Sequence, residues 1–340
     1  MDLELLRATL ADLGEPAYRE RQVWSWAARG VGGYDQMTDL PLGLRCALAD
    51  PVPFSSLTVR EEAHASDGTV KALFATGDGR PLEAVLMRYR DRRRSLCLSS
   101  QSGCPLTCAF CATGRMRFAR NLTASEILDQ ALHFRRGGPV DHAVFMGMGE
   151  PMMNLDAVLG ACERLPSLGI GSRHTTVSTV GWIPGIQRLA EQPLPLRLAL
   201  SLHAPDDALR SELMPVNDRY PLADVLDACR SYYERKRRMV FVEYVMLAGV
   251  NDSFVQARAL SRLLDPKLFK VNLIPYNPTG SEFRGSSQKA IEAFRAELER
   301  GGLTATVRLT RGRDIAAACG QLAAGRVGAE RTRRQLTAGG

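Results

Sequence analysis

The chain has 340 residues, of which 45% are hydrophobic, enough for one barrel-sized domain and a smaller one. No window approaches the roughly 20 unbroken apolar residues of a spanning helix, and the first residues are acidic and amphipathic, unlike a secretory signal peptide. These features exclude a helical membrane protein and a secreted one, so we expect a cytoplasmic protein with no membrane partner. The net charge of +7 fits an anionic partner such as nucleic acid but does not establish one.

The first 50 residues predict a small helical module. Leu3, Leu6 and Leu10 repeat at helical spacing, and Tyr18 to Ala28 predicts a second helix. Residues 51–92 change to a period of two, with turn signals at Ser66-Asp67-Gly68 and Gly77-Asp78-Gly79. This pattern predicts an antiparallel β meander that extends the main domain.

A run of three cysteines follows the meander, in the segment SLCLSSQSGCPLTCAFCATG. Cys104, Cys108 and Cys111 form a C-x₃-C-x₂-C spacing directly after a short apolar strand. Three thiolates in eight residues can hold an iron–sulfur cubane that keeps one iron free of protein ligands. Zinc is the weaker interpretation, because a structural zinc site needs four ligands and no second knuckle follows. A ferredoxin-type run ends in Cys-Pro, whereas Ala112 follows here.

From Ser95 onward, predicted strands and helices alternate, which favours a parallel sheet. The strands are expected at 95–99, 141–147, 174–179, 196–202, 240–246, 270–275 and 304–309, and the helices near 123–136, 155–165, 184–191, 222–235, 254–264 and 287–300. Right-handed crossovers curl such units into a partial (β/α) barrel, with functional loops at the carboxyl ends of the strands. We therefore predict an α/β fold with a barrel over 93–315 and a C-terminal segment over 316–340.

Polar motifs occur where several of these strands end. One strand ends at Gly149-Glu150-Pro151, where glycine allows close backbone approach to a ligand and the carboxylate can accept a hydrogen bond from an ammonium group. Others end at Ser178, at Ser201-Leu202-His203 and at Asn277. Such groups suit the ribose, carboxylate and adenine of a nucleotide-like ligand, although each alone would more often be a turn or capping residue.

Taken together, these segments resemble one family. The motifs SSQSGC, CAFCATG, MGMGEP, LSLHAP, EYVML, NLIPYNP and AACGQL occur in the order found in the RlmN/Cfr class of radical S-adenosylmethionine (SAM) adenine-C-methyltransferases, which act on large-subunit ribosomal RNA. The resemblance covers about residues 15 to 325. Two departures, Arg117 and Val180, leave the fine specificity open.

The resemblance implies a set of functional residues. It implies a [4Fe-4S] cluster on the three motif cysteines and SAM contacts from Gly149, Glu150, Ser178, Ser201, Leu202, His203 and Asn277. It also implies a methylated cysteine at Cys319, a redox partner at Cys97 and an acid/base carboxylate at Glu83.

The chemistry of the base is consistent with a need for two further cysteines. The adenine carbon to be methylated is electron-poor, so it cannot attack a SAM methyl group directly and a radical route is required. A first SAM would methylate Cys319, and a radical formed from a second would activate that methyl group for addition to the ring. Release then needs a proton acceptor and a thiolate that attacks the sulfur of Cys319. A buried, inert cysteine is the alternative interpretation of Cys97.

Several alternatives and partners accompany this interpretation. Methylation at carbon 2 of adenine is expected, with carbon 8, the antibiotic-resistance activity, as the alternative. A non-methylating radical SAM factor that binds or matures RNA is disfavoured because it would need neither Cys97 nor Cys319. The expected partners are 23S ribosomal RNA, transfer RNA as a possible second substrate, and an electron donor such as flavodoxin or ferredoxin, with the protein a monomer. Arginine clusters at 88–94, 115–120 and 235–238 are candidate phosphate contacts or solvated faces.

Overall fold

The structure is a computed structural model in which residues 1–323 are described. Its α-helices are α1 (Leu3–Asp12), α2 (Tyr18–Arg29), α3 (Leu42–Ala49), α4 (Ala124–Arg136), α5 (Leu155–Arg164), α6 (Ile183–Glu191), α7 (Asp207–Leu213), α8 (Leu222–Lys236), α9 (Phe254–Leu263) and α10 (Gln288–Arg300). Its strands are β1 (Leu57–His64), β2 (Val70–Thr76), β3 (Pro81–Arg88), β4 (Arg94–Cys97), β5 (Gln101–Ser102), β6 (Arg120–Asn121), β7 (His142–Phe145), β8 (Thr175–Thr179), β9 (Arg197–Ser201), β10 (Val240–Met246), β11 (Phe269–Pro275) and β12 (Thr304–Val307).

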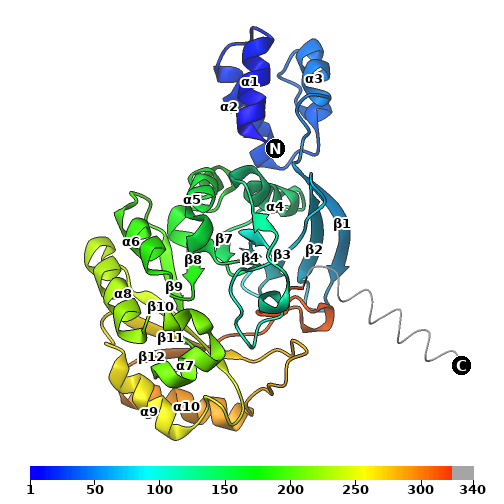
Figure 1. The fold of residues 1–340 in the computed structure, drawn as a ribbon. Coiled ribbons are helices and arrows are strands. Elements are labelled where there is room, and N and C mark those ends of the chain that lie inside the picture. Colours follow the sequence, from blue (N-terminus) through cyan, green and yellow to red (C-terminus); the bar gives the residue numbers. More distant parts are fainter. Residues whose placement is uncertain (324–340) are drawn as a thin grey trace, which may run out of the picture.

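The first three helices form a separate group at one end of the molecule (Figure 1). Asp2 begins α1 by accepting hydrogen bonds from the backbone N–H groups of Glu4 and Leu5, at 3.0 and 3.1 Å. The three leucines whose spacing predicted this helix are buried. Among the described residues, no helix combines the length and apolar character needed to cross a membrane.

Ten of the described strands form one mixed sheet in the order β1-β2-β3-β4-β7-β8-β9-β10-β11-β12. Strands β1 to β4 pair antiparallel, which is the predicted meander together with its junction to the barrel. Within this sheet every pairing from β4 to β12 is parallel, as the alternation of strands and helices predicted, while β5 and β6 form a separate antiparallel pair. Because parallel strands end at the same edge, their functional loops gather on one side of the sheet.

The helices that connect the parallel strands lie along the outer, convex face of this curved sheet (Figure 1). Side chains alternate between the two faces of a strand, so every second residue packs beneath the helices. In β9, Leu198 and Leu200 are fully buried on this outer face, and in β10 Val242 and Tyr244 are too. The residues between them face the concave side, which holds the site.

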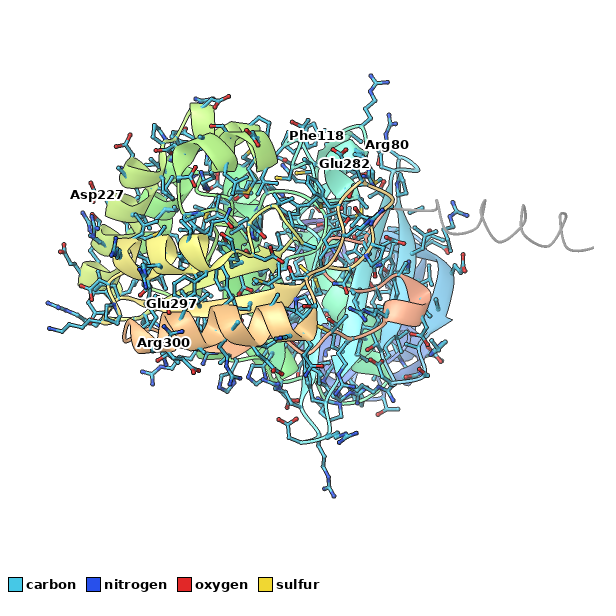
Figure 2. All side chains as sticks on the ribbon, turned by 90° about the horizontal axis from the view of Figure 1, so that it is seen from below. Arg80, Phe118, Asp227, Glu282, Glu297 and Arg300 are labelled. Carbon is cyan, nitrogen blue, oxygen red and sulfur yellow. The ribbon has the colours of Figure 1, made fainter. Side chains whose placement is uncertain are left out.

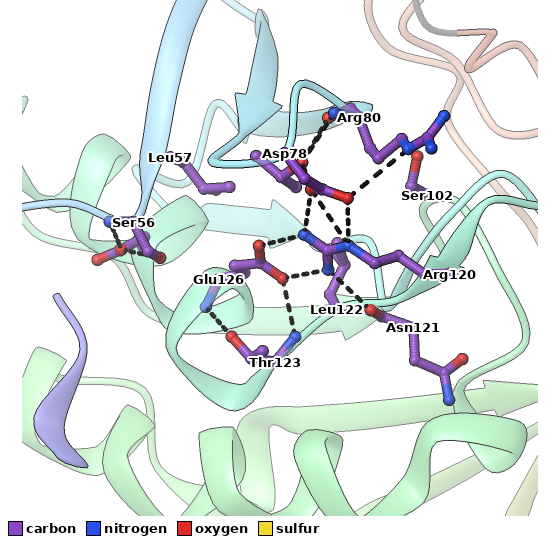
Figure 3. Close-up of polar contacts among 12 residues, drawn as sticks. Ser56, Leu57, Asp78, Arg80, Ser102, Arg120, Asn121, Leu122, Thr123 and Glu126 are labelled. Carbon is purple, nitrogen blue, oxygen red and sulfur yellow. Dashed lines mark hydrogen bonds and ion pairs between the residues drawn. The ribbon is translucent and has the colours of Figure 1, made fainter. Parts of the chain in front are cut away.

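A network of charged side chains joins the meander to the barrel (Figure 3). The guanidinium of Arg120 donates to Asp78, in the turn between β2 and β3, and to Glu126, each at 2.7 Å. Glu126 completes a capping box with Thr123 at the start of α4. These hydrogen bonds, to Glu126 and then to Asp78, raise the pKa of Arg120 above its ordinary value. The guanidinium of Arg120 is therefore occupied in linking the meander to α4, and we no longer count Arg120 among the candidate phosphate contacts.

Candidate active site

One cavity lies at the carboxyl ends of the parallel strands, where the sequence placed the site. Ten of the predicted site residues line it: Cys104, Cys108, Cys111, Gly149, Glu150, Ser178, Ser201, His203, Asn277 and Cys319. Leu202 is not on its lining. Its side chain is fully buried, and its backbone N–H donates to the carbonyl of Glu243 at 3.0 Å. Its predicted contact with SAM stays a prediction.

The cysteine loop is wound tightly and held from several sides. A Cβ at Gly114 would lie 2.8 Å from the carbonyl oxygen of Cys108, so a side chain there would push the loop open. Ala109 donates its N–H to the carbonyl of Leu213 at 3.0 Å, and Ala112 donates to Gly320 at 2.8 Å. The loop is thus held in place by α7 and by the segment that carries Cys319.

The three thiols fit an iron–sulfur cluster better than a single metal ion. Burial, with a further contribution from the other cysteines, raises the pKa of Cys108 well above its ordinary value, and burial raises that of Cys104 to about 12. Thiolates in this cavity therefore need a bound cationic group to offset the burial of their charge. In residues 1–323, no three His, Cys, Asp or Glu side chains are arranged to hold one metal ion. A cubane instead binds each thiolate at a separate iron.

Glu150 is buried and fixed by backbone groups. Its two carboxylate oxygens accept from the N–H of Met152 at 3.1 Å and from the N–H of Val180 at 3.0 Å. Burial raises its pKa to about 7, although these hydrogen bonds act in the opposite direction. A ligand ammonium group in the cavity would favour the ionised carboxylate. Val180 acts here through its backbone, so its departure from the family pattern leaves this contact intact.

His203 is held as a neutral imidazole. Burial, with a smaller contribution from Arg210, lowers its pKa to about 3. Its Nδ1 accepts from the N–H of Val245 at 3.0 Å, which assigns the ring proton to Nε2. Phe110, the aromatic residue of the cysteine motif, packs edge-on against the ring with centroids 4.7 Å apart. The imidazole can therefore donate one hydrogen bond through Nε2.

A second, smaller cavity adjoins the first at the C-terminal segment. Cys97, Arg308 and Cys319 all line it, and Cys319 also lines the first cavity. Burial, followed by the neighbouring Cys319, raises the pKa of Cys97 to about 12. Although Cys319 is exposed at the surface, desolvation of its thiol raises its pKa, while Arg308 acts to lower it. The two thiols predicted to react with each other are thus electrostatic neighbours.

The segment that carries Cys319 is anchored by hydrogen bonds. The amide of Asn277 donates to the carbonyl of Cys319 at 3.3 Å, and Thr113 Oγ1 donates to the carbonyl of Leu322 at 2.7 Å. Of the predicted segment 316–340, residues 324–340 lie outside the described part of the chain.

Glu83 lies beneath this segment and lines neither cavity. Its carboxylate is buried, 3.1 Å from the ammonium of Lys71, and it accepts from the N–H of Ala323 at 2.8 Å. Its acid/base role stays a prediction.

Sequence reasoning missed two charged residues of the site. Glu243, within the quoted motif EYVML, lines the first cavity, and its carboxylate lies 3.5 Å from Arg308. Burial acts to lower the pKa of Arg308, but Glu243 and then Cys319 outweigh it, so that pKa lies above its ordinary value. The alternation of β10 puts Glu243 on the concave face, and Arg308 directly follows β12. These positions were the signals that could have found the two residues.

Comparison with known proteins identifies the family of this fold and site. The model of the radical SAM superfamily matches residues 98–260. A probable dual-specificity RNA methyltransferase RlmN of Chloroflexus aurantiacus is 48% identical, over 95% of this chain and 91% of its own length. The chain belongs to the RlmN family. A second RlmN relative, from Thermus thermophilus, is 45% identical over 94% of this chain and 92% of its own length.

The fold of this RlmN-family chain also matches a solved structure. A radical SAM methyltransferase from Sphaerobacter thermophilus superposes with a TM-score of 0.90 and is 46% identical, covering 95% of this chain and 98% of its own. The predicted family and fold class are therefore confirmed. As a radical SAM enzyme, the RlmN-family chain uses a [4Fe-4S] cluster and SAM.

Proposed function

We propose that this chain methylates carbon 2 of an adenine in 23S ribosomal RNA, with transfer RNA as a second substrate, through a methylated cysteine and at the expense of two SAM molecules. The names of its relatives support RNA methylation. The observation that carries the finer proposal is the position of Cys319. It borders both the cavity of the cluster cysteines and the cavity of Cys97. A sulfur that receives a methyl group in one cavity and is then attacked by the thiol of Cys97 in the other must border both cavities.

The residues of the first cavity would hold the cofactors. Cys104, Cys108 and Cys111 would ligate the cluster, and Glu150 would accept a hydrogen bond from the amino group of SAM. When bound, the cluster and SAM supply methyl groups and a carbon-centred radical. Ser178 and Ser201, whose hydroxyl oxygens lie 3.5 Å apart, would bind the polar groups of SAM together with Gly149, His203 and Asn277.

The two further cysteines would handle the methyl carbon. The sulfur of Cys319 accepts a methyl group and later bridges to the base through that carbon. The thiolate of Cys97 then attacks the Cys319 sulfur, so that an S–S bond forms and the sulfur–carbon bond breaks toward the base. The base would lose its ring proton to Glu83 and the unpaired electron left by radical addition to the bound cluster, while the carbon released from Cys319 would take up a proton to become the methyl group. An external reductant such as flavodoxin or ferredoxin would then restore the two thiols. Because burial holds the pKa of Cys97 near 12, its deprotonation must be coupled to substrate binding or to Arg308.

The decisive experiment is anaerobic incubation of the reconstituted protein with ribosomal RNA fragments and methyl-labelled SAM, followed by nucleoside mass spectrometry. We expect label in 2-methyladenosine. Label in 8-methyladenosine would replace the proposed position but keep the reaction class. SAM cleavage without any labelled nucleoside would refute the methyltransferase assignment and favour a non-methylating RNA factor. Light scattering during the same preparation would test the expected monomer.

A further inference from the structure

The second cavity is lined by two thiols and two arginines, without a carboxylate among the described residues. The thiols are those of Cys97 and Cys319, and the arginines are Arg308 and Arg311. Leu309, on the same lining, is 62% exposed, and Cys319 is exposed as well, so the cavity opens to solvent. A thiol in it can therefore lose its proton to water, and an arginine nearby favours the thiolate that remains.

The two arginines of this cavity differ in the groups on which they act. Arg308 is among the groups that lower the pKa of both thiols, whereas Arg311 is not. Arg311 instead pairs with Asp67 at 3.7 Å, and its guanidinium carbon lies 5.3 Å from the ring centroid of Tyr89. Arg308 is therefore the arginine that can serve the thiols.

Arg308 is held at the boundary between the two cavities. Its backbone N–H donates to the carbonyl of Leu273 at 2.8 Å, which fixes the residue just beyond β12 and beside β11. Its Nη1 donates to the sulfur of Met146 at 3.1 Å, and Met146 lines both cavities. The carboxylate of Glu243, which lines the first cavity, lies 3.5 Å from the same nitrogen. The guanidinium is thus fixed beside groups that line each cavity.

A row of polar side chains across three strands orients Glu243. The strand register places Glu243 beside Asn272, and Asn272 beside Thr306. The amide of Asn272 donates to Oε1 of Glu243 at 2.9 Å, and Thr306 Oγ1 donates to Oδ1 of Asn272 at 2.6 Å. The Oε2 atom of Glu243 lies 3.5 Å from Arg308 and accepts no hydrogen bond from residues 1–323. A pair of this kind holds the arginine without the tight contact of a charge-assisted hydrogen bond, so its charge can also act on a thiolate.

The surroundings of Cys97 leave Arg308 as the cation that acts on it. Burial raises the pKa of Cys97 and the neighbouring Cys319 adds to this rise, while Arg308 and a backbone N–H lower the pKa. The cluster cysteines are not among these groups. The strands that flank β4 carry three titratable side chains, those of Glu83, Arg88 and His142. None of these three is among the groups that act on the pKa of Cys97.

We propose that Arg308, oriented by Glu243, stabilises the thiolate of Cys97 for its attack on the sulfur of Cys319. This inference rests on the proposed function, because only that reaction requires Cys97 to act as a nucleophile. The thiol proton leaves to solvent through the open cavity, and the guanidinium keeps its own protons. The electron pair of the thiolate then forms the S–S bond as the sulfur–carbon bond of Cys319 breaks. A guanidinium suits this role because it stays charged beside buried groups.

The test measures the reactivity of Cys97 as a function of pH in the full chain with its cluster reconstituted anaerobically. Cys319→Ser is the background, so that no disulfide forms and the second thiol contributes no charge. Methyl methanethiosulfonate, a small reagent that reacts with thiolates, is applied between about pH 7 and 10. Mass spectrometry then quantifies the modified peptide that carries Cys97. Arg308→Gln removes the charge, and Arg308→Lys keeps a charge at the same position.

Two control variants separate a charge near the thiol from the net charge of the protein. Arg311→Gln removes the other arginine of the same cavity. Arg300→Gln removes a charge at the end of α10, where Arg300 pairs with Glu297 (Figure 2). A third variant, Glu243→Gln, keeps an oxygen acceptor for Asn272 but removes the carboxylate that pairs with Arg308.

Removal of an opposite charge near an acid raises the pKa of that acid by about 1–3 units. We therefore expect the pH profile of Cys97 to move up by at least about 1 unit in Arg308→Gln. Modification at a fixed pH should then slow by about three- to tenfold per unit, because fewer but more nucleophilic thiolates are present. Arg308→Lys should move the profile less, and the two controls should not move it. Glu243→Gln should move it down, because the arginine loses the carboxylate that competes with the thiolate.

Several results would overturn the inference. An unmoved profile in folded Arg308→Gln, with only a lower unfolding temperature, would leave Arg308 a structural role. An equal shift in either control would show that only net charge matters. A shift of Glu243→Gln in the same direction as Arg308→Gln would show that the ion pair acts through structure and not through its positive charge. This comparison also decides the matter if Arg308→Gln does not fold.

Two further outcomes separate this inference from the proposed function. If Cys97 resists the reagent in every variant until the protein unfolds, the cavity does not present a thiolate and the inference is wrong. The thiol measurements need neither RNA nor SAM. Failure of the wild-type protein to methylate any RNA would therefore refute the proposed function by itself, whatever the profile of Cys97.

Discussion

Gly149 offers a quantitative test of how the backbone shapes the cavity. Its φ is +97°, and a Cβ placed there would lie 2.5 Å from the Cβ of Gln101. The side-chain oxygen of Gln101 accepts the N–H of Glu150 at 2.8 Å, so displacement of Gln101 would leave a buried donor unpaired. Alanine at 149 therefore adds about 1–3 kcal/mol of backbone strain and about 1–3 kcal/mol for the unpaired N–H. We expect Gly149→Ala to lower the free energy of unfolding by about 2–6 kcal/mol.

Two glycines in the turn between β2 and β3 separate these contributions. Gly79 has a φ of +78° and Gly77 has no positive φ, and a Cβ at either would meet nothing within 4 Å. Urea unfolding should therefore show almost no loss for Gly77→Ala, the strain alone for Gly79→Ala, and a further about 1–3 kcal/mol for Gly149→Ala. SAM affinity should fall only in Gly149→Ala. If Gly149→Ala is no less stable than Gly79→Ala, the contact with Gln101 does not hold Glu150 as described.

Four further outcomes are expected. Cys108→Ala should lose iron–sulfur absorbance after reconstitution, and a full four-iron complement in that variant would contradict the ligand assignment. Cys97→Ala should accumulate RNA linked covalently through Cys319, seen as a nuclease-sensitive band on a denaturing gel, whereas Cys319→Ala should give neither adduct nor methylated base; free turnover by Cys97→Ala would show that another thiol resolves the adduct. The pKa of His203 is about 3 in the folded chain and near 6.5 in the unfolded chain, so the free energy of unfolding should fall as pH drops from about 6.5 to about 3. This loss should be smaller in His203→Asn, which keeps an acceptor for the N–H of Val245. RNA affinity should fall with salt by about 0.7 log unit per log unit for each single-strand phosphate neutralised, with Arg92–Arg94 as candidate contacts; affinity that ignores salt would remove that role.

The course of the chain could be predicted because the hydrophobic period changes at clear boundaries. The strand expected at 240–246 is β10 to the residue, while the one expected at 304–309 ends at Val307. The missed helix α7 has only seven residues, too few for its period to stand out. The cysteines were found because three ligands share one loop, so their spacing is local.

Contacts between distant segments could not be predicted in this way. Nothing in the sequence near Glu83 indicates that it lies against Lys71 and Ala323, away from the lining of either cavity. Arg120 was counted with the RNA-binding arginines because its partner Asp78 is 42 residues away. Charge clusters therefore gave candidates, and only the fold showed which of their arginines, such as Arg120, are already paired.

The anchoring of the C-terminal segment also has a consequence for biosynthesis. Glu83 and Ala323 are 240 residues apart, so their hydrogen bond can form only after nearly all of the described chain has been made. Domains fold as units from the N-terminal side during translation, and a contact that closes so long a loop comes late. The barrel and its cysteine loop can thus exist for a time with Cys319 still undocked. The thiol predicted to carry the methyl group would arrive last, which leaves the cysteine loop open to solvent during the interval when iron and sulfide have to be delivered.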